Sequence, residues 1–160
     1  MAIEVRRGTA EDLEEVADLH KASILELCAE DYTPEQLASW TEALTPEGYK
    51  TLLGTRELFV ATDDGEVRGF GVLDLKASVI NATYVSPTAV GQGVGRALVE
   101  AMERVAIEHG LGQLTLHSTL NAVGFYEALG FVRGEQSTNR LPSGAELPCV
   151  VMRKSLPGHT

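Results

Sequence analysis

The segment Val90-Gly91-Gln92-Gly93-Val94-Gly95 decides the fold, because it joins a strand pattern to a helix pattern in mid-chain. Its three glycines stand at every second position, after the extended residues 79–85 and at the start of the helical residues 93–109. A helix start presents free N–H groups and a positive dipole end, and glycines let an anion approach the backbone. The segment therefore predicts a main-chain anion site, with Arg96 as an added charge. On the glycines alone, a flexible turn before an ordinary helix is an equally good interpretation.

Two familiar nucleotide-binding loops fit this segment badly. A Walker A loop ends in Gly-Lys-Ser/Thr, whereas Gly95 is followed by Arg96-Ala97. A Rossmann turn has the spacing Gly-x-Gly-x-x-Gly directly after a strand near the start of its domain. Here the spacing is Gly-x-Gly-x-Gly, and residues 86–90 separate the segment from the preceding strand. The spacing argues against a P-loop nucleotidase and against an NAD-binding oxidoreductase.

Upstream of the glycine segment, helix patterns come first and strand patterns follow. After a short strand at 3–6, Thr9 and Asp12 form a short-acid variant of the capping box before a helix that ends near residue 29. Two Thr-Pro-Glu signals begin short helices at 34–43 and 46–54. Strands follow at 58–61, 67–75 and 79–85, and the turns between them are too short for crossover helices. These strands are expected to form an antiparallel meander.

Downstream, a helix at 93–109 is followed by a strand at 114–117, a helix at 121–129, and strands at 131–132 and 147–152. A meander joined to a crossover helix predicts an α/β or α+β fold with a mixed, mostly antiparallel central sheet flanked by helices. The 160 residues are 44% hydrophobic, and no composition shift or linker divides them. We therefore expect one domain over residues 1–160.

Composition narrows the class of protein. A net charge of -10 argues against a nucleic-acid binder and is compatible with a cationic or amine substrate. The sequence has no apolar stretch of signal-peptide or membrane-spanning length, so we expect a cytoplasmic protein with no membrane partner. Cys28 and Cys149 lie far apart without metal-ligand spacing, so two reduced thiols and no metal site are expected.

Taken together, two motifs resemble the GNAT superfamily of N-acetyltransferases. Residues 84–98 are similar to its acyl-CoA signature, Arg/Gln-x-x-Gly-x-Gly/Ala after a strand. Residues 121–131 are similar to its Asn-…-Phe-Tyr-x-x-x-Gly-Phe segment, and the element order agrees over nearly the whole chain. One position departs, since Val90 stands where the family has Arg or Gln. We interpret this departure as tuning of a site in which loop amides supply most of the binding.

The resemblance implies that acetyl-CoA is the co-substrate and that its acyl group passes directly to an amine. It also implies that Tyr126 is the general acid to the CoA thiolate and that the main-chain N–H of Val85 is the oxyanion donor. Packing of Tyr126 in the core beside Phe125 is the alternative. The expected cofactor-binding residues are Tyr84, Val85, Val90, Gly91, Gln92, Gly93, Val94, Gly95, Arg96, Asn121 and Tyr126.

The sequence leaves the general base open. His117, at the end of a strand and four residues before Asn121, is the preferred candidate, because histidine is the side chain whose protonation ordinarily changes near neutral pH. Asp74 and Glu146 are others, and deprotonation through water is a further route. The amine is expected to meet the N-terminal helices, which carry Ser23, Tyr32, Trp40 and Tyr49. Trp40 can hold an ammonium group by a cation–π contact or simply belong to the core.

Two functions fit these observations. The first is an N-acetyltransferase that acts on a primary amine of a small molecule or peptide. The second is a non-catalytic acyl-CoA-binding or regulatory module on the same fold, which Val90 and the lack of an obvious base favour. The resemblance also makes a homodimer plausible.

Overall fold

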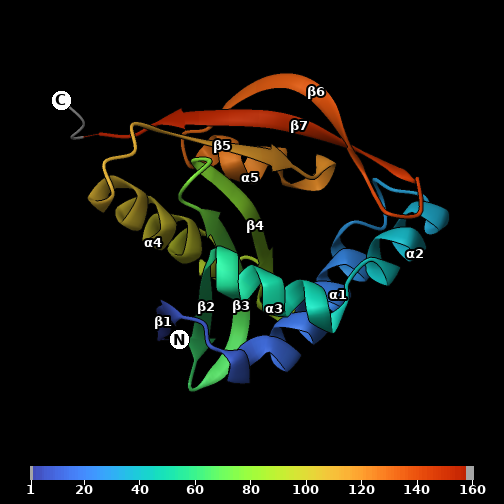
Figure 1. The fold of residues 1–160 in the computed structure, drawn as a ribbon, viewed down its shortest axis with the longest axis horizontal. Coiled ribbons are helices and arrows are strands. Elements are labelled where there is room, and N and C mark those ends of the chain that lie inside the picture. The colour runs from blue at the N-terminus through green and yellow to red at the C-terminus, as the bar shows by residue number, and fades with distance from the viewer. Residues whose placement is uncertain (1, 158–160) are drawn as a thin grey trace.

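Within residues 2–157, the part of the chain that the computed structural model describes, seven strands form one sheet with helices on both faces (Figure 1). The elements in chain order are β1 (Ile3–Arg7), α1 (Leu13–Leu27), α2 (Pro34–Glu42), α3 (Pro46–Thr55), β2 (Glu57–Asp63), β3 (Glu66–Asp74), β4 (Val79–Val85), α4 (Val94–Glu108), β5 (Gln113–Ser118), α5 (Val123–Ala128), β6 (Val132–Arg140) and β7 (Glu146–Ser155). Single 3₁₀ turns precede α1, the glycine segment and α5, namely η1 (Ala10–Asp12), η2 (Pro87–Ala89) and η3 (Leu120–Ala122). The predicted mixed α/β class is confirmed.

The order of strands across the sheet is β1-β2-β3-β4-β5-β7-β6. Strands β2, β3 and β4 form the expected antiparallel meander, and β1 pairs with β2 in an antiparallel direction at its edge. Strand β4 pairs with β5 in parallel through only two residue pairs, Val79↔Thr115 and Ile80↔Leu116. After Ile80 the two strands diverge, as the separation of β4 from β5 in Figure 1 shows. The carboxyl end of β4 is therefore left without a neighbour on that side.

Glycines in β3 let α4 lie close to the sheet. A Cβ atom on Gly69 would lie 2.7 Å from Cγ1 of Val94, and one on Gly71 would lie 2.7 Å from Cε of Met102. The alternate residue Phe70 faces the other side, where it packs with residues of α1 and α3. This close packing holds the first turn of α4 against the strand that neighbours β4.

A smaller core cluster joins the N-terminal helices to the last strands. Tyr32, Trp40 and Leu147 belong to it. The hydroxyl of Tyr32 donates to the carbonyl of Pro148 at 2.7 Å and accepts from the amide of Leu120 at 3.1 Å. One tyrosine thus connects the α1–α2 turn with β7 and with the turn before α5.

The predicted start of the first helix carries an ion pair. The Asp12 carboxylate accepts from the Thr9 amide at 2.8 Å, as the capping-box prediction requires, and from the Arg6 guanidinium through two bonds of 2.9 Å. The hydrogen bonds from Arg6 hold the pKa of Asp12 at about 2, although partial burial opposes this shift. This pair joins β1 to the start of α1.

The sequence prediction is wrong about the extent of β6. It expected a strand at 131–132 only, whereas β6 runs from Val132 to Arg140 and pairs with β7. Strand β6 is an edge strand with almost every residue exposed, so its sequence has no apolar alternation by which to recognise it.

None of the helices in the described part of the chain is both long and apolar enough to cross a membrane.

Candidate functional site

A cleft lies beside the free carboxyl end of β4 and runs beneath the glycine segment. Its walls come from β4, the start of α4, the η3–α5 segment and the end of α1. The lining residues are Ser23, Leu27, Cys28, Thr83, Tyr84, Val85, Ala89, Val90, Gly91, Gly93, Val94, Gly95, Arg96, Asn121, Ala122, Phe125, Ala128 and Leu129. The structure therefore brings the two sequence motifs, residues 84–98 and 121–131, to opposite walls of one cleft.

Backbone amides of β4 face this cleft. The Ser86 amide donates to the carbonyl of Arg68 on β3 at 2.7 Å. Alternate residues of an antiparallel strand direct their N–H groups to the same neighbour. The amides of Thr83 and Val85 consequently point to the opposite edge, where β5 pairs with β4 only as far as Ile80. These N–H groups are available to a ligand that lies along β4.

The glycine segment presents open backbone at the helix start. Gly91 and Gly93 have φ angles of 82° and 87°, a region that favours glycine. A Cβ atom on either residue would meet no atom within 4 Å. The Ala97 amide donates to the Gly93 carbonyl at 3.1 Å, and the amides before it belong to the first turn, which has no intrahelical acceptor. The segment thus combines open space at Gly91 and Gly93 with first-turn amides that have no intrahelical acceptor, the combination that an anion site requires.

The third glycine has a different role. A Cβ atom on Gly95 would lie 2.9 Å from Cζ of Phe125, so this glycine admits the Phe125 ring across the cleft. Val94 lines the cleft but is only 1% exposed, because its side chain belongs to the core. The Val90 side chain is 54% exposed and the exposed Gln92 does not line the cleft.

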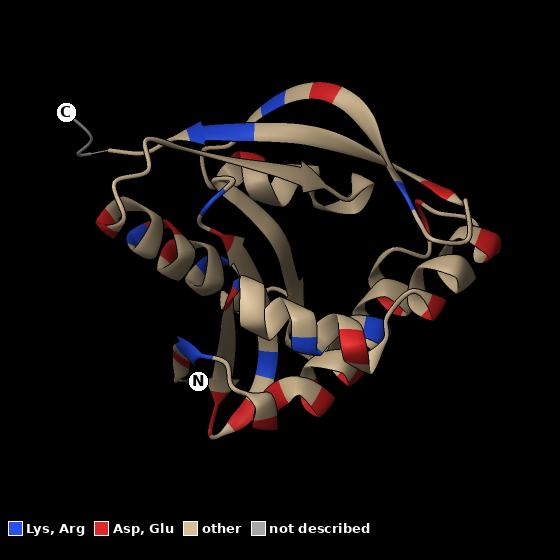
Figure 2. Cartoon of the chain, viewed as in Figure 1, with Lys and Arg blue, Asp and Glu red and all other residues tan. Residues whose placement is uncertain are grey.

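The charge of the cleft differs from that of the whole molecule. Acidic side chains are spread over the chain and recur along α1 (Figure 2). No Asp or Glu lines the cleft between residues 2 and 157, and Arg96 is its one charged lining residue in that range. The local field at the helix start is therefore positive despite the net charge of -10.

Tyr126 lies behind the cleft wall rather than in it. Its side chain is buried, with the Phe125 and Phe131 rings at centroid distances of 5.0 and 5.7 Å. Burial raises the pKa of Tyr126 to about 12, and the nearby Thr83 hydroxyl offsets only part of that rise. Within the described chain, the Thr83 hydroxyl is buried and makes no hydrogen bond of ordinary geometry. Thr83 lines the cleft, so Tyr126 is one side chain away from it.

A second pocket meets the cleft at Tyr84, which lines both. It lies between the N-terminal helices and the last strands, and its lining residues are His20, Tyr32, Trp40, Asn81, Ala82, Tyr84, His117, Thr119, Asn139, Arg140, Leu141, Leu147, Pro148 and Cys149. Three residues that the sequence singled out, His117, Tyr32 and Trp40, come together here. We refer to this space as the aromatic pocket.

The remaining candidate bases and amine-binding residues from the sequence do not line the aromatic pocket. Asp74 accepts hydrogen bonds from two following backbone amides and pairs with Arg56 at 3.2 Å, away from both spaces. Glu146 is exposed and pairs with Arg140 at 2.9 Å, at the edge of the aromatic pocket. Ser23 lines the cleft rather than the aromatic pocket. Tyr49 lines a third pocket, between α1 and α3.

Sequence reasoning missed His20, which lines the aromatic pocket from α1. Its ring lies 4.3 Å from that of Tyr84 and 5.1 Å from that of Phe70, measured between centroids. A signal was present in the sequence, because His20 falls four residues after Val16 and four before Ile24, both of which are buried. A histidine on the apolar stripe of a helix is a candidate for a buried polar role.

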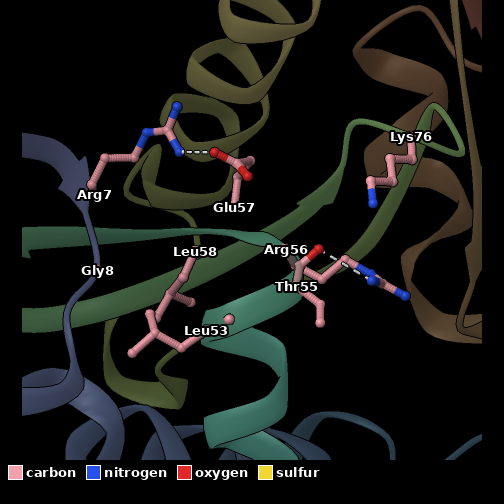
Figure 3. A pocket seen from close by; sticks show the side chains of 9 residues that line it. Arg7, Gly8, Leu53, Thr55, Arg56, Glu57, Leu58 and Lys76 are labelled. Atoms are coloured by element: carbon pink, nitrogen blue, oxygen red, sulfur yellow. Dashed lines mark hydrogen bonds and ion pairs between the residues drawn. The ribbon is translucent and has the colours of Figure 1, made fainter.

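The pocket in Figure 3 differs from the cleft and the aromatic pocket because several of its lining side chains are charged. Arg7 pairs with Glu57 across it, and its other two cations are Arg56 and Lys76. Because Arg56 also pairs with Asp74, carboxylates already neutralise two of the three cations. This pocket lies away from both sequence motifs, so it is not the site that they predict.

Cys28 and Cys149 are both free and buried. Burial raises the pKa of Cys28 to about 11 and that of Cys149 above its ordinary value, so neither is a ready thiolate nucleophile. Among the described residues, no group of three or more His, Cys, Asp or Glu side chains is placed to hold a metal ion.

Comparison with protein families gives a match over most of the chain. Residues 28–156 match the family described as "Acetyltransferase (GNAT) domain". Peptidyl-lysine N-acetyltransferase YjaB of Salmonella typhimurium is 30% identical over 132 residues, which cover 82% of this chain and 84% of that protein.

Solved structures agree with this match. A GCN5-related N-acetyltransferase from Rhodopseudomonas palustris has a TM-score of 0.90 at 32% identity and covers 98% of this chain and 99% of its own. PaiA N-acetyltransferase from Thermoplasma acidophilum, solved in complex with coenzyme A, has a TM-score of 0.79 at 23% identity and covers 97% of this chain and 99% of its own. The second similarity concerns the fold alone.

Proposed function

The chain belongs to the GNAT acetyltransferase family, and from this premise we propose that it transfers an acetyl group from acetyl-CoA to the primary amine of a small molecule or peptide. One observation carries the proposal. The cleft that joins the two family motifs and the aromatic pocket share Tyr84 as a lining residue, which would let a donor and an acceptor approach the same part of β4.

Coenzyme A binding is assigned to backbone groups first. The pyrophosphate would accept hydrogen bonds from the amides of the glycine segment at the start of α4, with Arg96 close by. The pantetheine arm would lie along the free edge of β4 and pair with the amides that point away from β3. Asn121, which also lines the cleft, would contact the same arm. Because these contacts come from backbone groups, they do not require a polar side chain at position 90, which supports the interpretation of Val90 as a tuning position.

The chemistry needs an oxyanion donor and a proton for the departing sulfur. The Val85 amide points into the cleft without a strand partner, which suits it to donate to the developing oxyanion. Tyr126 is the proposed general acid. A phenol whose pKa is about 12 keeps its proton at neutral pH, so it can donate to the CoA thiolate as that charge develops. Thr83 lines the cleft, and its hydroxyl partly offsets the rise in the pKa of this phenol, so the two groups are close enough to interact.

The acceptor is assigned to the aromatic pocket. Its aromatic rings, Tyr32, Trp40 and Tyr84, suit the hydrocarbon part of an amine and can stabilise an ammonium group before it loses a proton. The overall negative charge favours the approach of a cationic substrate. The name of the Salmonella typhimurium relative, a peptidyl-lysine N-acetyltransferase, supports a lysine side chain as one form of this amine. His117 stays a candidate base at the exposed wall of the pocket.

Release of free thiol tests the proposal. Acetyl-CoA is mixed with the protein, a thiol reagent and a panel of amines that includes a lysine-containing peptide, a polyamine and an aromatic amine. We expect thiol release that depends on one class of amine and saturates with it. Saturable CoA binding without amine-dependent release would contradict the proposal and would favour the non-catalytic acyl-CoA-binding module.

A further inference from the structure

One ring nitrogen of His20 has a hydrogen-bond partner, and the other has none among the described residues. Its Nδ1 lies 2.9 Å from the hydroxyl oxygen of Tyr49. Its Nε2 is buried and has no hydrogen-bond partner among the described residues. A buried polar atom without a partner is destabilising unless something outside the protein completes it. Since His20 lines the aromatic pocket, the group that completes Nε2 is expected to come from that pocket.

The His20–Tyr49 pair stands between two separate pockets. His20 borders the aromatic pocket, together with Tyr84 and His117. Tyr49 borders the pocket between α1 and α3, where Asp18 and Lys50 also lie. The 2.9 Å contact is therefore a polar connection through an otherwise apolar layer that contains Phe70. Figure 1 shows α1 and α3, which carry the two residues, on the same face of the sheet.

We propose that His20 accepts the proton of the attacking amine and that Tyr49 passes an equivalent proton to water in the pocket between α1 and α3. The inference rests on the acetyl transfer proposed above and adds the base that the sequence left open.

The relay balances as a sequence of proton transfers. The imidazole starts with its proton on Nδ1, donated to the Tyr49 oxygen, and with the lone pair of Nε2 toward the amine. As the amine nitrogen bonds to the acetyl carbon, its N–H bond breaks and an Nε2–H bond forms. The Nδ1–H proton moves to the Tyr49 oxygen, and the original Tyr49 proton moves to water. When the amide product leaves, Nε2–H gives its proton to water in the emptied pocket, Tyr49 returns a proton to Nδ1, and water in the pocket between α1 and α3 reprotonates Tyr49, so one proton in all is released for each amine.

The surroundings of His20 explain why a relay suits it better than simple protonation. The rings that pack against it, those of Tyr49, Phe70 and Tyr84, carry no charge that would stabilise an imidazolium ion. Burial lowers the pKa of His20 to about 4, so the ring is neutral at the pH where amines react. A neutral ring does not repel an ammonium group, and passing a proton on in the same step avoids a buried cation.

His117 is the rival candidate base, since it is a histidine of the same pocket but lies exposed on β5, so its variant is compared with those of His20. His20→Gln, His20→Asn, Tyr49→Phe and His117→Gln are compared with the unaltered protein under saturating acetyl-CoA, using the amine that the panel identifies. CoA affinity and melting temperature, measured for every variant, establish that each is folded. His20→Asn retains a side-chain amide near Tyr49 but lacks an atom in place of Nε2.

We expect both His20 variants to lower kcat by about 100-fold, within the range of general acid–base catalysis, with CoA affinity unchanged. Tyr49→Phe should lower kcat about tenfold and turn a curved dependence of kcat on D2O fraction into a straight one, because the proton transfers from Nδ1 and from Tyr49 are then both lost and only the transfer from the amine to Nε2 remains in the relay. His117→Gln should lower kcat by less than either His20 variant does, because the relay runs through His20.

Three results would overturn the relay. They are full kcat in a folded His20 variant, a curved D2O dependence that survives Tyr49→Phe, or a 100-fold loss in His117→Gln alone. If the unaltered protein is inactive with every amine, the proposed acetyl transfer itself fails. Activity in the unaltered protein with equal activity in His20→Asn refutes only the relay.

Discussion

Gly93 and Gly110 bracket α4 and offer a matched test of the anion site. Gly93 has a φ of 87° at the start of the helix, and Gly110 has a φ of 78° just after its end. A Cβ atom on either residue would meet no atom within 4 Å. Gly93→Ala and Gly110→Ala therefore impose nearly the same backbone strain on the same helix, and only the first adds a methyl group at the proposed pyrophosphate site.

The expected magnitudes separate stability from binding. An L-residue in the left-handed region costs about 1–2 kcal/mol, so both variants should lose about that much free energy of unfolding. At Gly93 the methyl group also holds a phosphate off the loop amides. Loss of one charge-assisted hydrogen bond is worth about 1.5–3 kcal/mol, which corresponds to roughly 10- to 100-fold weaker CoA binding. Gly110→Ala should leave CoA affinity within about twofold.

Urea denaturation measures the first quantity, and calorimetric titration with CoA measures the second. Equal CoA affinity in the two variants would refute the assignment of the pyrophosphate to the start of α4. A loss of affinity in both would show that general destabilisation, rather than the local methyl group, weakens binding.

Three further changes test other parts of the structure. Tyr126→Phe should lower kcat by at least about tenfold with little change in CoA affinity, and steady-state rates that match the unaltered protein would remove Tyr126 from the chemistry. Asp12→Asn should lower the free energy of unfolding by about 1–2 kcal/mol at pH 7, after allowance for the half-exposed Arg6. The folded-state pKa of Asp12 is depressed to about 2, so this contribution is present above the unfolded pKa near 3.8 and is lost as the pH falls toward 2. Urea melts of both proteins at pH 7 and pH 2 check the sign, and a difference that grows on acidification would be inconsistent with it. Tyr32→Phe removes a hydroxyl that donates a hydrogen bond at 2.7 Å and accepts one at 3.1 Å, so it should lower the free energy of unfolding by about 1–3 kcal/mol in the same urea melts. An unchanged free energy of unfolding would show that these two hydrogen bonds do not stabilise the protein.

Local patterns made much of the fold predictable. The Thr-Pro-Glu signals at Thr33 and Thr45 begin α2 and α3, and both threonine hydroxyls accept the expected backbone hydrogen bond. The meander followed from short turns between apolar strands. Strand β6 was not predictable in the same way, because an exposed edge strand has no buried face to impose alternation.

Side-chain position in the site was harder to predict than backbone position. The glycines marked the helix start, yet Gly95 makes room for Phe125, a contact between segments that are distant in sequence. Asp74 had a suitable residue type for a base, but its bonds to Arg56 and to backbone amides commit it elsewhere. His20 acquires its place only when α1, α3 and β4 pack together, so no spacing in the sequence announces its contact with Tyr49.

Transfer of an isotopically labelled acetyl group tests the central claim most directly. Acetyl-CoA carrying 13C in its acetyl group is incubated with the protein and the amine that gives most thiol release, and products are weighed by mass spectrometry. The account predicts a labelled amide formed in equal amount to free CoA, with formation slowed in Tyr126→Phe. Bound acetyl-CoA that never labels an amine, or thiol release without a labelled amide, would contradict it.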